Sequence, residues 1–241
     1  MKNGKTEENP KVLVGCPVSD YHEYCTDEYL KAVKTLSYTN YDILLVDNSK
    51  DDGFFNSIKD EVPVIRTEYN ENVYERIINS RNILRQKALE GAYDYFFSLE
   101  QDVIPPRNVI ERLLIYKEDI TTGLYFKPWD EENSKEPVAM IWVKHRSEPN
   151  KVVPVRGNIL NGNNLVRVDF CGLGCILISK KVLEKIKFRY DPSDCIGTDD
   201  IFFCKDAAKH GFNIYADTAV KCKHLLSGRT WTWNDLLPEE I

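Results

Sequence analysis

At 241 residues, the chain is long enough to bury the core of one large α/β domain. Hydrophobic residues make up 42% and charged residues 29% of it, which is typical of a globular protein and excludes a disordered or fibrous chain. The formal net charge of −6 argues against a nucleic-acid-binding protein, because such proteins normally carry a basic surface.

The sequence contains no apolar run long enough for a membrane span, and its polar start lacks the apolar core of a signal peptide. These features predict a cytoplasmic protein without a transmembrane segment and leave peripheral contact with a membrane open. The seven cysteines lie mostly inside apolar runs, which indicates buried free thiols in a reducing compartment.

The first half of the chain alternates short apolar runs with segments of helical periodicity. The predicted strands cover 11–17, 41–46, 62–66 and a central run that ends at Leu99, and the predicted helices cover 26–36, 53–58, 73–89 and 108–117. Such alternation predicts an α/β fold with a mixed, mostly parallel central sheet and helices on both faces.

The second half is less regular. Strands are predicted at 120–126, 138–145 and 213–217, and a charged loop at 127–137 has little to bury except Trp129. The apolar run 168–178 contains Gly172 and Gly174, which permit a bend or close backbone approach. Helices are predicted at 180–186 and from Ile201 onward, the latter ending at Gly211. We expect a flexible leader at 1–10, one domain at 11–225 and a tail at 226–241.

The central strand stops at the sequence Glu100-Gln101-Asp102. Carboxylates at the carboxyl end of a strand in an open α/β sheet lie where such folds bind ligands. Since side chains alternate along a strand, Glu100 and Asp102 are expected to point the same way, with Gln101 opposed. Two converging carboxylates suit Mg²⁺ or Mn²⁺. A solvated acidic turn is the alternative interpretation.

Several motifs, in this order, resemble those of GT-A-fold glycosyltransferases, near the large family-2 group, over about residues 11–225. They are the first strand with Pro17, the second strand ending at Asp47, Ser80-Arg81-Asn82, Glu100-Gln101-Asp102, the segment 169–186, Thr198-Asp199-Asp200 and a late histidine, His224. The sequence departs from the family pattern at Glu100 and Asp199, where the family has Asp and Glu respectively.

The resemblance implies a metal-dependent transferase that moves a sugar from a nucleotide-sugar donor, with UDP-sugar favoured, to a hydroxyl acceptor on a glycan, a lipid-linked molecule or a small molecule. It implies Mn²⁺ or Mg²⁺ bound by Asp102 and His224. It also implies donor contacts from Pro17, Asp47, Arg81, Glu100 and Gln101. Asp200 is the implied general base of an inverting reaction, and Asp199 would position the base or the acceptor.

Each of these residues also has a structural interpretation. Asp47 can be a turn residue, Arg81 a paired helix residue, Asp199 and Asp200 charges at a helix N-terminus, and His224 an ordinary core histidine. Two other functions also stay open: a non-catalytic module that binds nucleotide sugars or glycans, and a sugar nucleotidylyltransferase. The latter is disfavoured because the loop after the first strand has no glycine cluster.

Overall fold

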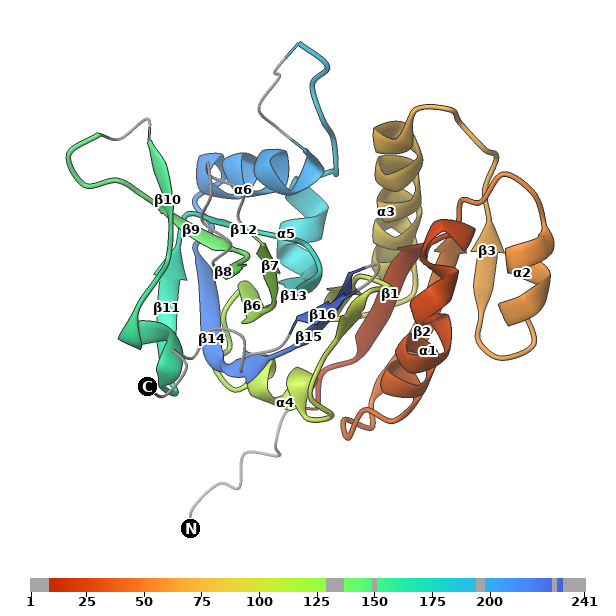
Figure 1. The fold of residues 1–241 in the computed structure, drawn as a ribbon, viewed down its shortest axis with the longest axis horizontal. Coiled ribbons are helices and arrows are strands. Elements are labelled where there is room, and N and C mark those ends of the chain that lie inside the picture. The colour runs from red at the N-terminus through yellow and green to blue at the C-terminus, as the bar shows by residue number, and fades with distance from the viewer. Residues whose placement is uncertain (1–8, 129–136, 149–150, 194–197, 227–228, 232–241) are drawn as a thin grey trace.

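The computed structural model describes residues 9–128, 137–148, 151–193, 198–226 and 229–231 (Figure 1). Its largest sheet has the strand order β11-β14-β6-β13-β4-β1-β2-β3. The strands are β1 (Val12–Val18), β2 (Tyr41–Asp47), β3 (Val64–Arg66), β4 (Tyr95–Leu99), β6 (Ile120–Leu124), β11 (Leu165–Val168), β13 (Cys175–Ser179) and β14 (Ile214–Lys221).

Most neighbours in this sheet are parallel. β4, β1, β2 and β3 pair in parallel, and β14 is parallel to β6. β13 runs antiparallel between β4 and β6, and β11 is antiparallel to β14 at the edge. The prediction of a mixed, mostly parallel α/β sheet is therefore confirmed.

Helices cover both faces of the sheet, and each face has its own apolar core. α1 (Thr26–Lys34), α2 (Gly53–Ile58) and α4 (Val109–Leu114) pack on one face. α3 (Val73–Glu90), α5 (Lys180–Lys185) and α6 (Asp199–Lys209) pack on the other. Side chains of β4 alternate between the two cores, with Phe96 in one and Phe97 in the other, as expected for a strand buried on both sides.

Three smaller sheets complete the second half. They consist of β9 (Ile141–Lys144) with β10 (Val152–Pro154) and β12 (Phe170–Cys171), of β5 (Val103–Ile104) with β15 (Lys223–Leu226) and β16 (Arg229–Trp231), and of β7 (Phe126–Pro128) with β8 (Pro137–Ala139). Two short 3-10 helices, η1 (Asp20–Cys25) and η2 (Asn158–Asn161), complete the list of elements.

Several predicted boundaries differ from the structure. The strand predicted at 138–145 is interrupted at Met140, so that β8 and β9 belong to different sheets. The predicted end of α6 is confirmed, because Gly211 follows the helix with a φ of 80°. The six described cysteines are buried free thiols. Cys195, Trp129, Trp233 and most of the predicted leader and tail lie outside the described residues.

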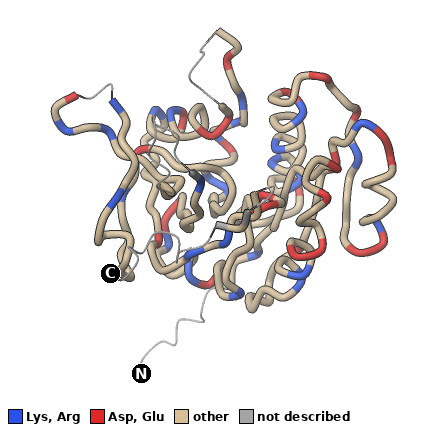
Figure 2. The backbone as a smooth tube through the Cα atoms, in the orientation of Figure 1, with Lys and Arg blue, Asp and Glu red and all other residues tan. Residues whose placement is uncertain are grey.

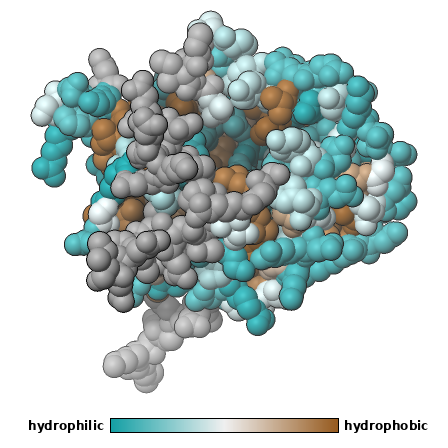
Figure 3. Space-filling model, viewed as in Figure 1, coloured by the Kyte–Doolittle hydropathy of each residue, from teal (hydrophilic) through white to brown (hydrophobic). Residues whose placement is uncertain are grey.

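The molecule has no segregation of charge along its described backbone, where basic and acidic residues are interspersed (Figure 2). One face is hollowed between the half that carries α3 and β1 and the half that carries α6 and β9, and apolar residues are visible inside the hollow (Figure 3). Within the described part of the chain, no helix is long and apolar enough to cross a membrane.

Candidate active site

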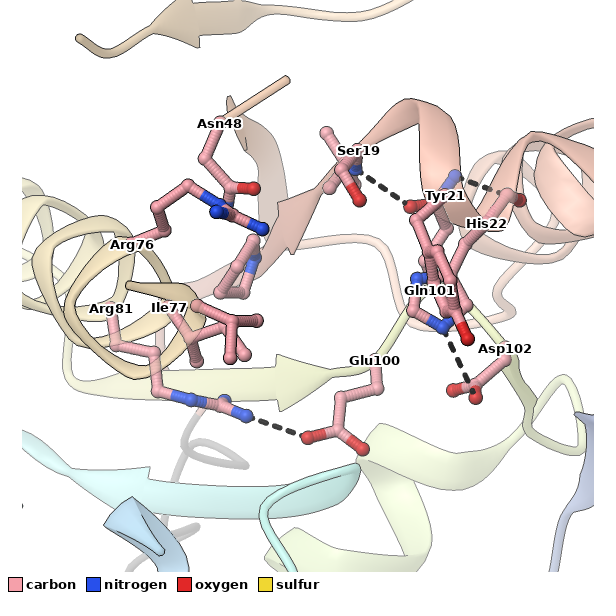
Figure 4. A pocket seen from close by; sticks show the side chains of 13 residues that line it. Ser19, Tyr21, His22, Asn48, Arg76, Ile77, Arg81, Glu100, Gln101 and Asp102 are labelled. Atoms are coloured by element: carbon pink, nitrogen blue, oxygen red, sulfur yellow. Dashed lines mark hydrogen bonds and ion pairs between the residues drawn. The ribbon is translucent and has the colours of Figure 1, made fainter. Parts of the chain in front are cut away.

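A pocket of about 470 Å³ opens at the carboxyl ends of β1, β2 and β4 (Figure 4). The segment after β1 contributes Ser19, Tyr21 and His22 to its wall. The first half of α3 forms another wall, and the turn Glu100–Asp102 lies along the floor. The position agrees with the rule that open α/β sheets bind ligands at the carboxyl edge of their strands.

Glu100 and Asp102 both line this pocket, as predicted, but the reason given for it was wrong. The strand ends at Leu99, so strand alternation does not set their direction. The amide of Val103 instead donates to the carbonyl of Glu100 at 3.0 Å, which folds the segment into a turn. The turn therefore places both carboxylates in the pocket wall, where Glu100 contacts Arg81 and Asp102 contacts His224.

Arg81 links the floor of the pocket to the start of α6. Its Nη2 donates to Glu100 Oε1 at 2.6 Å, and its Nη1 donates to the hydroxyl of Ser98 at 2.9 Å. Its Nε lies 2.7 Å from Asp199 Oδ2, at ion-pair distance but without hydrogen-bond alignment. Only 4% of the arginine side chain is exposed.

The electrostatic balance at Arg81 favours its charged form. Burial alone lowers the pKa of a guanidinium, but Asp199 and Glu100 outweigh it, so that the pKa of Arg81 is raised. Both carboxylates share this one cation. Arg81 therefore holds a residue of the β4 turn and a residue of α6 in fixed relative positions.

Asp200 differs from Asp199 in its partners. It begins α6 beside Asp199, and its Oδ1 accepts hydrogen bonds from the Thr198 hydroxyl and, at 2.7 Å, from the Ile201 amide. Among the described residues, no cation lies within ion-pair distance of its carboxylate. Burial raises the pKa of Asp200, against the opposing effect of the Thr198 hydrogen bond. Neither aspartate is part of the pocket wall itself.

His224 is not part of the pocket wall, but it lies beside Asp102 because β15 pairs with β5, the short strand directly after Asp102. Its Nε2 lies 3.2 Å from Asp102 Oδ2, and its Nδ1 lies 2.6 Å from the carbonyl oxygen of Phe126. Since a carbonyl only accepts, Nδ1 must carry the hydrogen. A neutral His224 thus turns an acceptor nitrogen toward an acceptor oxygen.

This contact of two acceptors is stable only with a cation between them or a proton on His224. In the absence of a metal ion, Asp102 raises the pKa of His224, although burial acts in the opposite direction. The carboxylate and the oriented imidazole are therefore a fitting pair of ligands for a divalent metal. In the described part of the chain, no group of three or more such side chains is arranged to hold a metal ion.

His22 is a site residue that the sequence analysis missed. It lines the pocket, and its Nε2 lies 3.8 Å from Asp102 Oδ2. Burial lowers its pKa, which keeps the ring neutral and available as an acceptor. The irregular segment after β1 gave no periodic signal that could place this histidine near Asp102.

Of the other residues predicted to bind the donor, two line the pocket and one does not. Pro17 and Gln101 line the pocket, but the side-chain amide of Gln101 forms hydrogen bonds with other residues of the protein. Its Oε1 accepts from the Ser19 amide at 3.1 Å, and its Nε2 donates to the Thr26 hydroxyl at 2.8 Å. Gln101 thereby fixes the segment that carries His22.

Asp47 is fully buried and is not part of the pocket wall. Its Oδ1 accepts from the Ser49 amide at 3.0 Å and from the Ser49 hydroxyl at 2.6 Å. Its neighbour Asn48 lines the pocket instead. This geometry agrees with the turn interpretation of Asp47, and it makes Asn48 the polar group that β2 presents to a ligand.

The architecture is similar to that of solved proteins in complex with nucleotides or nucleotide sugars and Mn²⁺. The structure of GalNAc-T7 with UDP, GalNAc and Mn²⁺ matches with a TM-score of 0.68 and 14% identity, over 92% of this chain and 45% of that one. The mannosyltransferase PcManGT from Pyrobaculum calidifontis, in complex with GDP-Man and Mn²⁺, matches with a TM-score of 0.52 and 14% identity. That match covers 88% of this chain and 58% of the mannosyltransferase.

These matches show that the chain has the GT-A fold, as the sequence motifs predicted. The chain spans about half the length of the two proteins. The sequence itself matches no family model and no curated protein. The fold is therefore established by structure, and the chemistry of this chain has to be argued from its own residues.

Proposed function

We propose that this protein is a metal-dependent glycosyltransferase that transfers a sugar from a nucleoside-diphosphate sugar to a hydroxyl acceptor. The observation that carries the proposal is the meeting of three separate motifs at one sheet edge. Asp102 lies beside His224, and Arg81 joins the neighbouring Glu100 to Asp199 at the start of α6. The nucleotides named for the two similar structures support a UDP or GDP donor, and we favour UDP.

Asp102 and His224 would hold the divalent ion, with Mn²⁺ favoured over Mg²⁺ because imidazole is a better ligand for manganese. When bound, the ion offsets the negative charge that develops on the departing diphosphate. His224 is kept in the correct tautomer by the Phe126 carbonyl, so its Nε2 lone pair faces Asp102. Arg81 keeps Glu100 from moving toward that ion.

Asp200 is the proposed general base. An acceptor hydroxyl is a poor nucleophile near neutral pH, and a carboxylate within hydrogen-bond reach can take its proton as it attacks the sugar. Asp199 is paired with Arg81, whereas the hydrogen-bond donors that the described residues offer to Asp200 are neutral. This difference favours Asp200 as the base and Asp199 as a positioning residue. Direct attack assisted by one base gives an inverted product.

Calorimetric titration with UDP and GDP, with and without Mn²⁺, tests the donor site. We expect one nucleotide to bind to the wild-type protein in a metal-dependent way, and we expect Asp102→Ala to remove that dependence. Asp119→Ala is the matched control, since Asp119 binds Ser179 and Lys181 on another part of the fold. Absence of nucleotide binding under every metal condition would refute the proposal.

The catalytic step is tested separately with the sugar nucleotide of the base that binds. Transfer or slow hydrolysis of the donor by wild type, lost in Asp200→Asn with donor affinity retained, is the expected result. Donor binding without any turnover would instead support the non-catalytic binding module. Formation of a nucleotide sugar from a sugar phosphate and a nucleoside triphosphate would support a nucleotidylyltransferase.

A further inference from the structure

The proposed function does not yet say which positively charged side chain contacts the phosphates of the donor. Two arginines line the pocket, Arg76 and Arg81, and both lie on α3. The resemblance of Ser80-Arg81-Asn82 to the family motif predicts that Arg81 contacts the donor. Its guanidinium is nevertheless buried and already shared by two carboxylates and a serine hydroxyl. An arginine in that state has little capacity left for a ligand.

Arg76, unlike Arg81, contacts no carboxylate among the described residues. None of the ion pairs among the described residues includes it. Its Nη1 donates to the backbone carbonyl of Asn70 at 2.6 Å and to that of Glu71 at 3.4 Å. The guanidinium also lies over the ring of Tyr69, with its Cζ 4.6 Å from the ring centroid. The side chain is thus held in place by neutral groups, and its guanidinium is not paired with a carboxylate of the described residues.

The remaining donors of Arg76 are unused. Its Nε is buried and has no hydrogen-bond partner among the described residues, and the same residues offer none to Nη2. Buried polar groups are normally hydrogen-bonded, so an unpaired guanidinium edge in a pocket wall indicates a partner that comes from outside the protein. Guanidinium donates only, and it matches the oxygen atoms of phosphates better than any other side chain.

Positively and negatively charged side chains lie at different ends of the pocket. Figure 4 shows Arg76 and Asn48 together at one end, with Asp102 and His22 at the other and Glu100 on the floor between them. A free anion would be repelled by the carboxylates and attracted to Arg76. A diphosphate that spans the pocket would meet Arg76 on one side and the metal held at Asp102 on the other.

We infer that Arg76, rather than Arg81, supplies the cationic contact to the diphosphate of the donor. The inference rests on the proposed function, since it assigns a residue within the same site. Anchoring by Nη1 and by the ring of Tyr69 fixes the side chain before the ligand arrives, which lowers the entropy lost on binding.

The test is a titration of the 241-residue protein with UDP, GDP and inorganic pyrophosphate, carried out both with Mn²⁺ and with Mg²⁺. Pyrophosphate has no base or ribose, so it isolates the phosphate contact. We expect Arg76→Ala to weaken binding of both the preferred nucleotide and pyrophosphate about ten- to a hundredfold, the usual effect of losing a charged hydrogen bond. Lys87→Ala is the matched control, since this lysine is on the same helix and pairs with Glu90.

Arg76→Gln is the second variant and covers a failure of Arg76→Ala to fold, because it retains a polar side chain of similar length without the charge. A thermal melt checks that each variant is folded. An affinity for pyrophosphate that is unchanged in both variants overturns the inference, and so does a loss confined to the nucleotides, which would place Arg76 against the nucleoside. If the wild-type protein binds no nucleoside diphosphate with either metal, the proposed function is refuted, and this inference is refuted with it.

Discussion

Arg81 holds together two parts of the candidate site that come from distant segments of the chain. It is the shared cation of Glu100 and Asp199, which come from a strand end and a helix start far apart in the sequence. Two such carboxylates repel each other in a partly desolvated site unless a cation lies between them. The Ser-Arg-Asn motif is therefore better understood here as a means of assembling the site than as a donor contact.

Removing this cation should be costly. We expect Arg81→Ala to lower the free energy of unfolding by about 3 kcal/mol or more, because it leaves two carboxylates without a partner in a buried site, and to abolish transfer. Urea denaturation followed by circular dichroism measures the first effect. Arg189→Ala is the control: Arg189 pairs with Asp206 at the same 2.7 Å, but it is 48% exposed. That variant should lose at most about 1 kcal/mol, and equal losses in the two variants would contradict the assigned role of Arg81.

The pH dependence expected for the proposed transfer follows from the assignment of Asp200 as its base. Burial raises its pKa above the ordinary aspartate value of about 3.9, and the base must be ionised to act. We therefore expect kcat/KM to rise with pH through this raised pKa on the acid side of the profile. In the same interval the folded state binds the proton more tightly than the unfolded state does, so the contribution of Asp200 to stability falls as pH rises.

Asp200→Asn separates the two roles that this residue can have. If Asp200 is a base held in an unfavourable environment, the amide should abolish transfer and leave stability at neutral pH unchanged or slightly higher. If Asp200 is merely a helix N-terminal charge, the variant should lose stability, by up to about 1 kcal/mol, and keep transfer. Melting curves at neutral pH together with initial rates distinguish these outcomes.

The elements of the first half could be predicted because their apolar periodicity is local. The helices at 53–58 and 73–89 agree with α2 and α3 almost to the residue. The segment 138–145 could not be predicted, since it is one apolar run in the sequence and only its partners divide it. Met140 donates its amide to the Tyr125 carbonyl at 2.9 Å, and the chain there passes from the sheet of β8 to that of β9.

The site followed the same division. The acidic turn and the start of α6 lie at a strand end and a helix start, and the order of the motifs that resemble the family drew attention to both. His22 and Arg76 carry no such signal, because their roles depend on pairings between distant segments. His22 is placed through Gln101, which binds the Ser19 amide and the His22 carbonyl. Arg76 looks like any polar residue on a helix until its neighbours are known.

Gly174, which precedes β13, allows this element to approach the site closely. The amide of Gly174 donates to the hydroxyl of Tyr125 at 3.0 Å, and a Cβ at this position would lie 2.7 Å from both Glu100 Oε2 and Tyr125 Cζ. We expect Gly174→Ala to lower the free energy of unfolding by about 1–3 kcal/mol, as overpacking does in a filled core, and to weaken nucleotide binding by displacing Glu100. Denaturation and titration of the same variant measure both effects. Full stability and affinity would show that the contact is not restrictive.

At the scale of the whole molecule, the two residues proposed to bind the metal come from distant parts of the chain. Asp102 follows β4 in the middle of the large sheet. His224 lies on β15, more than one hundred residues later in the sequence. Only the pairing of β15 with β5 brings them to 3.2 Å. Two protein ligands leave most of the coordination positions of Mn²⁺ or Mg²⁺ to water and to phosphate oxygens of a substrate.

This shortage of protein ligands predicts strong coupling between metal and nucleotide. We expect Mn²⁺ alone to bind weakly and the nucleoside diphosphate alone to bind weakly, with each raising the affinity for the other by the same factor, as linkage requires. Titration of each ligand in the absence and in the presence of the other measures that factor. His224→Ala should reduce the coupling and Asp102→Ala should nearly remove it. Tight binding of Mn²⁺ to the nucleotide-free protein would contradict this account, because it would require further ligands from the chain, and His22 is the residue then to be replaced first.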